Sequence, residues 1–152
     1  MSRRMVQDVA VTGRMRKKLQ RRLMHAVMFG ETRWVSSALR SGADPNALDR
    51  FHGTPLYQAS VKGRGDVVRI LVRAGADPQA PSYGLGSDGL PLCAAACWGH
   101  TEAVRELLAA GADPDAREDD GAGYTASEWA AQGGWGATLA VLQAARERVT
   151  PA

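Results

Sequence analysis

Two cysteines and a histidine in the middle of the sequence are of types that could do chemistry. Cys93 and Cys97 are four residues apart, so they would share one face of a helix, and His100 follows three residues later. Thiolate and imidazole are preferred ligands of zinc, and a cysteine beside a base can act as a nucleophile. However, no fourth ligand lies nearby, and none of the three histidines forms a recognisable dyad with a cysteine. We therefore expect small buried thiols, no metal and no catalytic residue.

Residues 84–89 read Gly-Leu-Gly-Ser-Asp-Gly and match the dinucleotide-binding pattern G-x-G-x-x-G literally. Such a site needs the loop to lie between a strand and a long helix, whose N-terminus faces the pyrophosphate. Here Pro81 and Ser82 precede the glycines, and Leu90-Pro91 follow them. A hairpin tip explains the glycines better, so we expect no cofactor.

The positive charge of the chain is concentrated at its start. Residues 1–22 hold eight Lys or Arg residues and one acidic residue, whereas residues 23–152 hold eleven basic and fifteen acidic residues. An apolar stripe at helical spacing runs through this arm, formed by Met15, Leu19, Leu23, Ala26 and Val27. The basic residues beside it are Arg14, Arg16, Lys17, Lys18, Arg21 and Arg22. One interpretation is a long first helix that seals the end of the domain and whose charges are only solvated. The alternative is contact with nucleic acid or an anionic surface.

The composition points to one domain without a membrane anchor. The chain has 152 residues and no apolar run near the roughly 18 residues that a membrane span needs. Polar residues interrupt the N-terminal segment, so no secretory signal is expected. Two cysteines do not make a disulfide framework, which favours a reducing environment. We expect a cytoplasmic protein.

The tetrapeptide Gly-Ala-Asp-Pro occurs three times, at residues 42–45, 75–78 and 111–114. An apolar pattern with helical period precedes each copy; in the first copy it consists of Trp34, Val35, Ala38 and Leu39. Each glycine falls where a helix needs a left-handed residue after its end, and each proline prevents the helix from resuming. Thr54-Pro55 predicts a further helix start, while Leu90-Pro91 lacks the capping hydroxyl.

These residues resemble the ankyrin repeat. The likeness rests on Asp49 to Ala59, which include Gly-Thr-Pro-Leu, and on the run from Gly99 to Asp113. It implies an all-α solenoid of helix–turn–helix units with short β-hairpin loops. The units would span residues 23–48, 49–80, 81–116 and 117–148, with the first and last as caps and residues 149–152 as a tail. The resemblance also implies that His100 is structural.

In this family the first helices and the hairpin tips line a concave groove, which implies where a protein partner would bind. The groove positions here are His25, Met28, Phe29, Gln58, Val61, Lys62, Cys97, Trp98, Trp129 and Gln132. Trp98 and Trp129 are expected to lie near each other as aromatic anchors, because tryptophan is frequent at binding hot spots. The alternative is that both pack against adjacent units.

The predicted function is therefore non-catalytic protein–protein interaction, as an adaptor, an inhibitor or a regulatory subunit that is monomeric on its own. The alternative is a nucleic-acid-associated regulator that uses the basic arm. Salt separates the two, because binding by the arm should weaken steeply with ionic strength and binding by aromatic anchors only slightly.

Overall fold

The computed structural model describes residues 3–51, 53–83 and 89–149, with side chains placed between residues 12 and 148 of these ranges. Eight α-helices are present in this part of the chain. They are α1 (Arg3–Phe29), α2 (Thr32–Arg40), α3 (Pro55–Val61), α4 (Gly65–Arg73), α5 (Pro91–Cys97), α6 (Thr101–Ala109), α7 (Ala126–Gln132) and α8 (Gly136–Val149). A single 3₁₀ turn, η1 (Asp119–Gly121), lies in the loop before α7.

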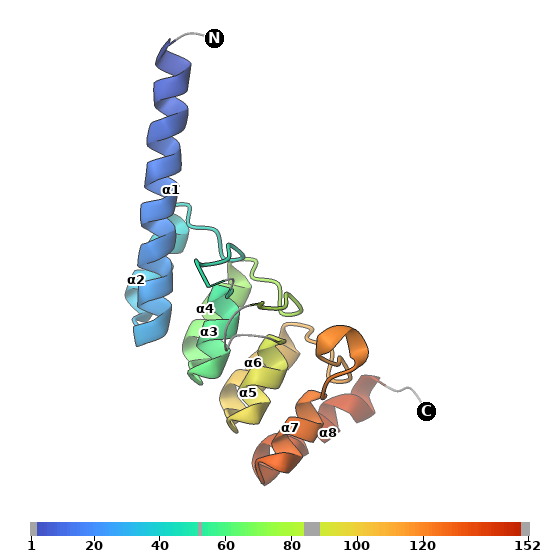
Figure 1. Cartoon of the computed structure of the whole chain (residues 1–152). Coiled ribbons are helices and arrows are strands. Elements are labelled where there is room, and N and C mark those ends of the chain that lie inside the picture. Colours follow the sequence, from blue (N-terminus) through green and yellow to red (C-terminus); the bar gives the residue numbers. More distant parts are fainter. Residues whose placement is uncertain (1–2, 52, 84–88, 150–152) are drawn as a thin grey trace.

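The helices form four consecutive pairs that stack side by side (Figure 1). The first helices of the pairs, α1, α3, α5 and α7, contact one another in order and form one row, and α2, α4, α6 and α8 form the other. In the described residues the loops contain only two isolated β-bridges, Ser82 with Gly89 and Arg117 with Thr125. The predicted all-α repeat solenoid is confirmed, with its hairpins reduced to single bridges.

The repeated glycines end the second helix of the first three pairs, as predicted. The φ angles are 96°, 93° and 92° at Gly42, Gly75 and Gly111. In the first pair, Gly42 N–H donates to the Leu39 carbonyl and Ala43 N–H to the Ala38 carbonyl, each at 3.0 Å. This is the double hydrogen bond of a Schellman motif, and the buried methyl group of Ala43 completes it.

The starts of α3, α5 and α7 differ in their side-chain capping. Thr54 Oγ1 accepts the Tyr57 N–H at 3.1 Å, whereas Leu90 offers no side-chain cap, and both findings were expected from the sequence. Thr125 forms a capping box with Glu128, in which each backbone N–H donates to the other side chain, at 3.2 and 2.7 Å. The Thr-x-x-Glu spacing of Thr125 and Glu128 was the available sequence signal for this box.

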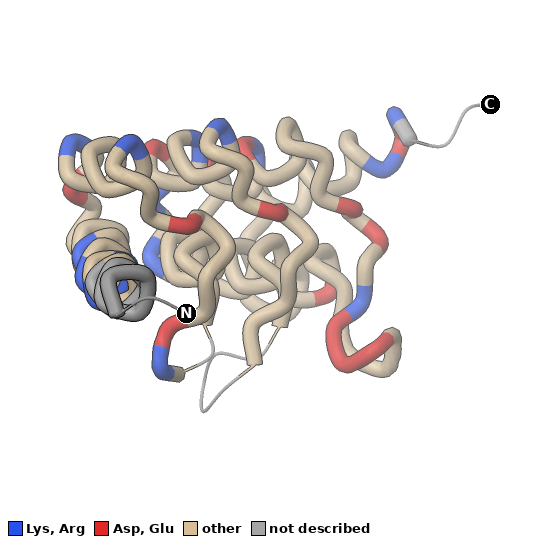
Figure 2. Tube along the Cα trace, turned by 90° about the horizontal axis from the view of Figure 1, so that it is seen from above, with Lys and Arg blue, Asp and Glu red and all other residues tan. Residues whose placement is uncertain are grey.

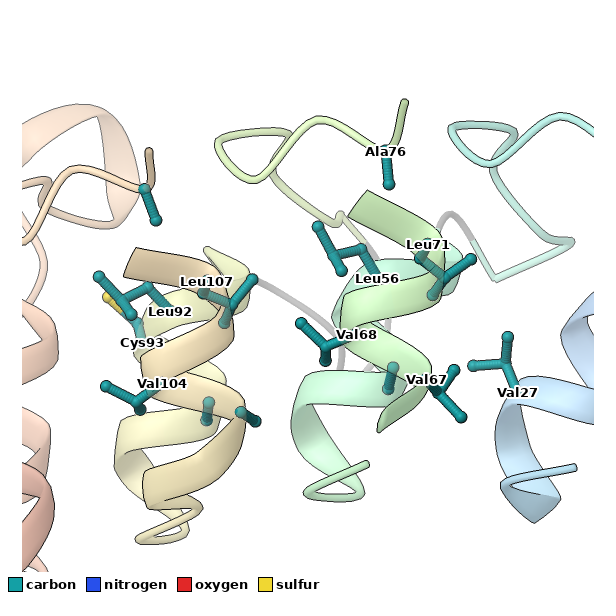
Figure 3. Packing of buried hydrophobic residues seen from close by; sticks show 14 of the residues in the cluster. Val27, Leu56, Val67, Val68, Leu71, Ala76, Leu92, Cys93, Val104 and Leu107 are labelled. Carbon is teal, nitrogen blue, oxygen red and sulfur yellow. The ribbon is translucent and has the colours of Figure 1, made fainter. Parts of the chain in front are cut away.

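Apolar side chains from both rows meet between the helices (Figure 3). Leu56 of α3 lies with Val68 and Leu71 of α4, and the next pair repeats the arrangement with equivalent residues of α5 and α6. All of these side chains are almost completely buried, and each contributes about 1.5–3 kcal/mol through apolar burial.

The apolar pattern predicted before the first tetrapeptide needs a correction at one residue. Val35 and Ala38 are buried, whereas Trp34 is 66% exposed. Successive helix residues point about 100° apart, since a turn contains about 3.6 residues. When Val35 faces the core, Trp34 therefore points to the side, at the border of the apolar face.

Side-chain amides connect the loop of one pair to the next element. Gln20 of α1 donates to the Asp44 carbonyl at 3.0 Å and accepts the Asp44 N–H at 3.2 Å. Asn46 repeats this one pair later, since it donates to the Gly75 carbonyl at 2.9 Å and accepts the Asp77 N–H at 2.8 Å. The Gln20 amide thus holds the first loop to α1 of the same pair, and the Asn46 amide holds the loop after the second pair to the loop after the first.

The same series continues to the last helix. Gln79 accepts the Asp113 N–H at 2.9 Å, and Asp115, at the position equivalent to Gln79, pairs with Arg146 of α8 at 2.6 Å. We call the contacts made by Gln20, Asn46, Gln79 and Asp115 the loop ladder.

α1 is one uninterrupted helix, so the basic arm and the first helix of the first pair are the same element. Its N-terminal half projects beyond the loops of the stack (Figure 1). Of the predicted apolar stripe, Leu23 and Val27 are fully buried, whereas Met15 is 56% exposed because it lies in the projecting half. The long first helix expected from the stripe is present. The division of the chain into an arm, four units and a tail stays a proposal.

Candidate functional site

Three of the predicted partner-binding residues lie at equivalent positions, at the ends of consecutive helices. Phe29 ends α1, and Lys62 and Trp98 directly follow α3 and α5. Phe29 and Trp98 are 62% and 60% exposed, and Lys62 is exposed as well. The fourth pair has Gly133 at this position. We call Phe29, Lys62 and Trp98 the inner-end row.

The residues immediately before the row are also among the predicted ones. Met28 and Gln132 are exposed, and Val61 and Cys97 are half-buried. They border the inner-end row and leave its aromatic side chains accessible. Gln58 lies one helical turn earlier in α3 and is half-buried.

Trp129 lies in a different environment from Trp98. It is half-buried, its Nε1–H donates to Glu118 Oε2 at 2.7 Å, and its ring meets Tyr124 edge-on with centroids 4.9 Å apart. Its position in α7 corresponds to Gln58, one turn before the level of the inner-end row. Trp98 and Trp129 are thus not equivalent residues, and Trp129 packs against the loop of its own unit.

Glu118 connects this loop to the preceding pair. Its Oε1 accepts the Leu90 N–H at 3.2 Å, while its Oε2 accepts from Trp129. Burial raises the pKa of this carboxyl group, and the hydrogen bonds from Trp129 and Leu90 act against that rise. Burial, and after it the charge of Glu118, raises the pKa of the nearby Cys93 thiol. Cys93 therefore stays a neutral thiol at neutral pH, which suits neither a nucleophile nor a metal ligand.

The third residue of the possible metal set, His100, has a structural contact. Its Nε2 lies 3.0 Å from the Val61 carbonyl, and its ring covers Gly63. One pair later Trp135 does the same, since its Nε1–H donates to the Cys97 carbonyl at 3.0 Å and its ring covers Gly99. The sequence patterns did not single out Trp135. Its place after an inter-helix glycine, as for His100, was the available signal.

The six basic residues predicted as arm contacts lie on α1, and all of them are exposed. Figure 2 shows these cations on α1 and acidic residues along the loops of the stack. Arg14, Arg16 and Lys17 lie toward the projecting half. Lys18, Arg21 and Arg22 lie beside the second helix. No ion pair joins any of the six to an acidic residue in the described part of the chain.

Lys18, Arg21 and Arg22 form one wall of an open groove of about 590 Å³ between α1 and α2. His25, which the sequence assigned to the concave groove, lines this groove too, and its ring lies 4.6 Å from that of Phe29. On the α2 side the lining residues include Trp34, Ser37, Ala38 and Ser41. We call this the end groove. The sequence pointed to its cations but not to Trp34.

Exposed aromatic side chains also occur in the loops. Phe51, Tyr83 and Tyr124 are 54%, 60% and 46% exposed. They lie in three consecutive loops, one before each of α3, α5 and α7. The sequence patterns pointed to the glycines of these loops and not to the aromatic residues.

Two further observations limit the chemistry of the described residues. None of their helices is long and apolar enough to cross a membrane. Within the same residues, no three His, Cys, Asp or Glu side chains gather in a way that could hold a metal ion. The glycine-rich stretch 84–88, which matched the dinucleotide pattern, lies outside the described residues.

The chain matches the family model of the ankyrin repeat at residues 52–83 and 90–119. These two stretches contain α3 and α4, and α5 and α6.

Several curated proteins are similar to part of this chain. The 2-5A-dependent ribonuclease of Mus musculus is 44% identical over 57 residues, which is 37% of this chain and 8% of that protein. Potassium channel KOR1 of Oryza sativa subsp. japonica is 44% identical over 54 residues, 36% of this chain and 6% of that protein. Cyclin-dependent kinase 4 inhibitor B of Mus musculus is 39% identical over 56 residues, 37% of this chain and 42% of that protein. The similarity spans less than half of each relative.

Proposed function

We propose that this chain, which is built from ankyrin repeats, is a non-catalytic module that binds another protein as an adaptor, an inhibitor or a regulatory subunit. Ankyrin repeats generally mediate protein–protein interaction, and each stacked unit adds to one extended binding surface. The similarity to an inhibitor named for a kinase is consistent with such a role. The identity of the partner does not follow from these partial similarities, because the same repeat occurs in proteins of very different names.

The inner-end row carries the proposal. Phe29 and Trp98 expose most of their aromatic surface at equivalent positions, with the cationic Lys62 between them in the order of the pairs. Exposed aromatic rings of this kind act as anchors when a partner covers them, and the polar or half-buried residues beside them form the rim. Trp129 has a lesser part, since its indole N–H is already bonded within the chain.

The test is to compare partner capture by the wild type and by a Phe29→Ala/Trp98→Ala double variant in an extract of the source cell. Loss of each anchor should cost about 2 kcal/mol of binding free energy, so the partner should be absent from the variant. Met15→Ala is the matched control, because Met15 is 56% exposed but lies in the projecting half of α1, outside the row. A partner retained by the double variant at wild-type affinity would contradict the proposal.

We also propose that the chain is cytoplasmic and monomeric without its partner. Light scattering on the purified chain measures the second point. A stable dimer at micromolar concentration would contradict it.

A further inference from the structure

The end groove is a second surface, and none of the inner-end row residues lines it. It runs between α1 and α2, and its lining includes no residue of α3 or α4. No helix of the described residues covers it, although the other sides of α1 and α2 are covered by α3 and α4. The groove is therefore bounded by two helices and open where another helix would fit between them.

The two walls of the end groove differ in chemistry. The α1 wall presents the cations of Lys18, Arg21 and Arg22, none of which forms an ion pair within the described residues. The α2 wall presents the ring of Trp34, which is 66% exposed, above the small residue Ala38. Small residues on the floor let a bound helix approach closely, and an exposed tryptophan supplies a large apolar contact.

We propose that the end groove binds an acidic amphipathic helix of a protein partner. The acidic side of such a helix faces the three cations of α1, and its apolar side packs on Trp34 and Ala38. This is the helix-in-groove mode of recognition, with charge setting the orientation and apolar anchors supplying affinity.

Other occupants fit the groove less well. A nucleic-acid backbone carries charge on all sides, but only the α1 wall is cationic, and the carboxylate of Glu31 lies in the groove lining. A second copy that stacked end to end would present the groove beside α8, whose last turn carries Arg146 and Arg148 and would repel the cations of α1.

The test is a selection from a displayed library of helical peptides against the full chain, followed by anisotropy titration of the enriched peptides. Enriched sequences should carry Asp or Glu along one face and Leu, Phe or Trp along the other. Arg21→Glu/Arg22→Glu should weaken their binding by more than about tenfold, and Trp34→Ala by roughly tenfold. All three substituted side chains are exposed, so the variants should melt with the wild type.

Two control variants make the result specific. Arg33→Glu/Arg40→Glu changes the net charge equally on α2 but at residues that do not line the end groove, and it should leave the affinity within about twofold. Trp98→Ala should leave peptide binding unchanged, because Trp98 does not line the end groove, and this separates the proposal from the function of the inner-end row.

Four outcomes would overturn the proposal. The first is that no acidic helix is enriched, and the second is that both charge-reversal variants weaken binding equally. The third is that random-sequence duplex DNA binds more tightly than every peptide and is released by Arg21→Glu/Arg22→Glu. The fourth is that the chain dimerises and that Trp34→Ala abolishes the dimer. The last two would assign the groove to nucleic acid or to a second copy.

Discussion

The contact between the second and third helix pairs and the contact between the third and fourth use the same positions but different side chains. In the first contact, the buried Ser82 hydroxyl accepts the Thr54 N–H at 3.0 Å. In the second contact, the Glu118 carboxylate accepts the Leu90 N–H at 3.2 Å. Both acceptors come 28 residues after their donors. The position requires an acceptor for a helix-start N–H, and either a hydroxyl or a carboxylate supplies it.

The opposite ends of the same two contacts follow the same rule. His100 Nε2 and Trp135 Nε1 each bond to the carbonyl of the last residue in the first helix of the preceding pair, both at 3.0 Å. An imidazole is thus exchanged for an indole while the ring still covers the glycine below it. The comparison shows that both contacts keep the hydrogen bond and the covered glycine. The side chains that make these contacts differ in charge and in ring size.

The largest loss of stability is expected at Gly63, where the His100 ring leaves no room for a side chain. Gly63 has a φ of 65°, and a Cβ atom there would lie 2.5 Å from His100 Nδ1. Gly63→Ala should lower the free energy of unfolding by about 3 kcal/mol, from left-handed backbone strain and crowding together. Urea unfolding measures the loss. Gly42→Ala is the control, since Gly42 also has positive φ but nothing within 4 Å, and it should lose only the backbone part of about 1 kcal/mol. Equal losses would show that the ring is not the obstacle.

The next largest loss of stability should distinguish the two acceptors, Ser82 and Glu118. Ser82→Ala should lower the free energy of unfolding by about 2 kcal/mol, because the Thr54 N–H is left buried without a partner. Glu118→Ala should cost only about 1 kcal/mol, since the half-buried site admits water and the variant no longer desolvates a carboxylate. The same urea series measures both variants. A larger loss for Glu118→Ala than for Ser82→Ala would reverse the interpretation.

A smaller effect should appear with pH, at the second contact alone. Burial raises the pKa of Glu118 above its ordinary value, so the folded chain holds this proton at a pH where the unfolded chain has released it. Stability from this group is present below the unfolded pKa and is lost as pH rises through the folded pKa. The stability of the wild type minus that of Glu118→Gln should therefore fall as pH increases across the carboxyl range. A difference that rises with pH would mean that hydrogen bonding outweighs burial.

The smallest effect on stability is expected in the inner-end row. Trp98→Lys gives the third pair the residue that the second pair has at this position, Lys62. Because Trp98 is 60% exposed, the free energy of unfolding should change by less than about 0.5 kcal/mol. Thermal melting checks this. A loss of 2 kcal/mol or more, of the size seen for core residues, would place Trp98 in the core and remove it from the binding surface.

The parts of this fold that could be predicted are those whose causes are local in sequence. The Schellman end at Gly42 follows from a glycine and an alanine after an apolar helix, and the Thr54 cap follows from a hydroxyl before a proline. The absence of a side-chain cap at Leu90 could be predicted for the same reason.

The parts that could not be predicted depend on contacts between residues 11 to 38 positions apart in the sequence. Nothing near Trp129 in the sequence shows that Glu118 will hold its indole, or that Trp135 will replace a histidine over Gly99. The end groove combines α1 with α2, and the exposure of Trp34 depends on which side of α2 the core takes. The site was therefore predicted as a set of positions; in the structure Trp129 lies one turn before the inner-end row, and His25 lines the end groove while its ring contacts Phe29.

The loop ladder has a consequence for how the molecule opens. The inner contacts of the loop ladder, made by Asn46 and Gln79, each join two successive loops. The contacts at its two ends, made by Gln20 and by Asp115 with Arg146, have a neighbouring contact on one side only. In a one-dimensional stack, local unfolding then begins by fraying at an end and advances pair by pair. Amide hydrogen exchange should accordingly be slowest in α3 to α6 and faster in α2 and α8, so that the outermost pairs exchange their protons with solvent while the central pairs remain closed.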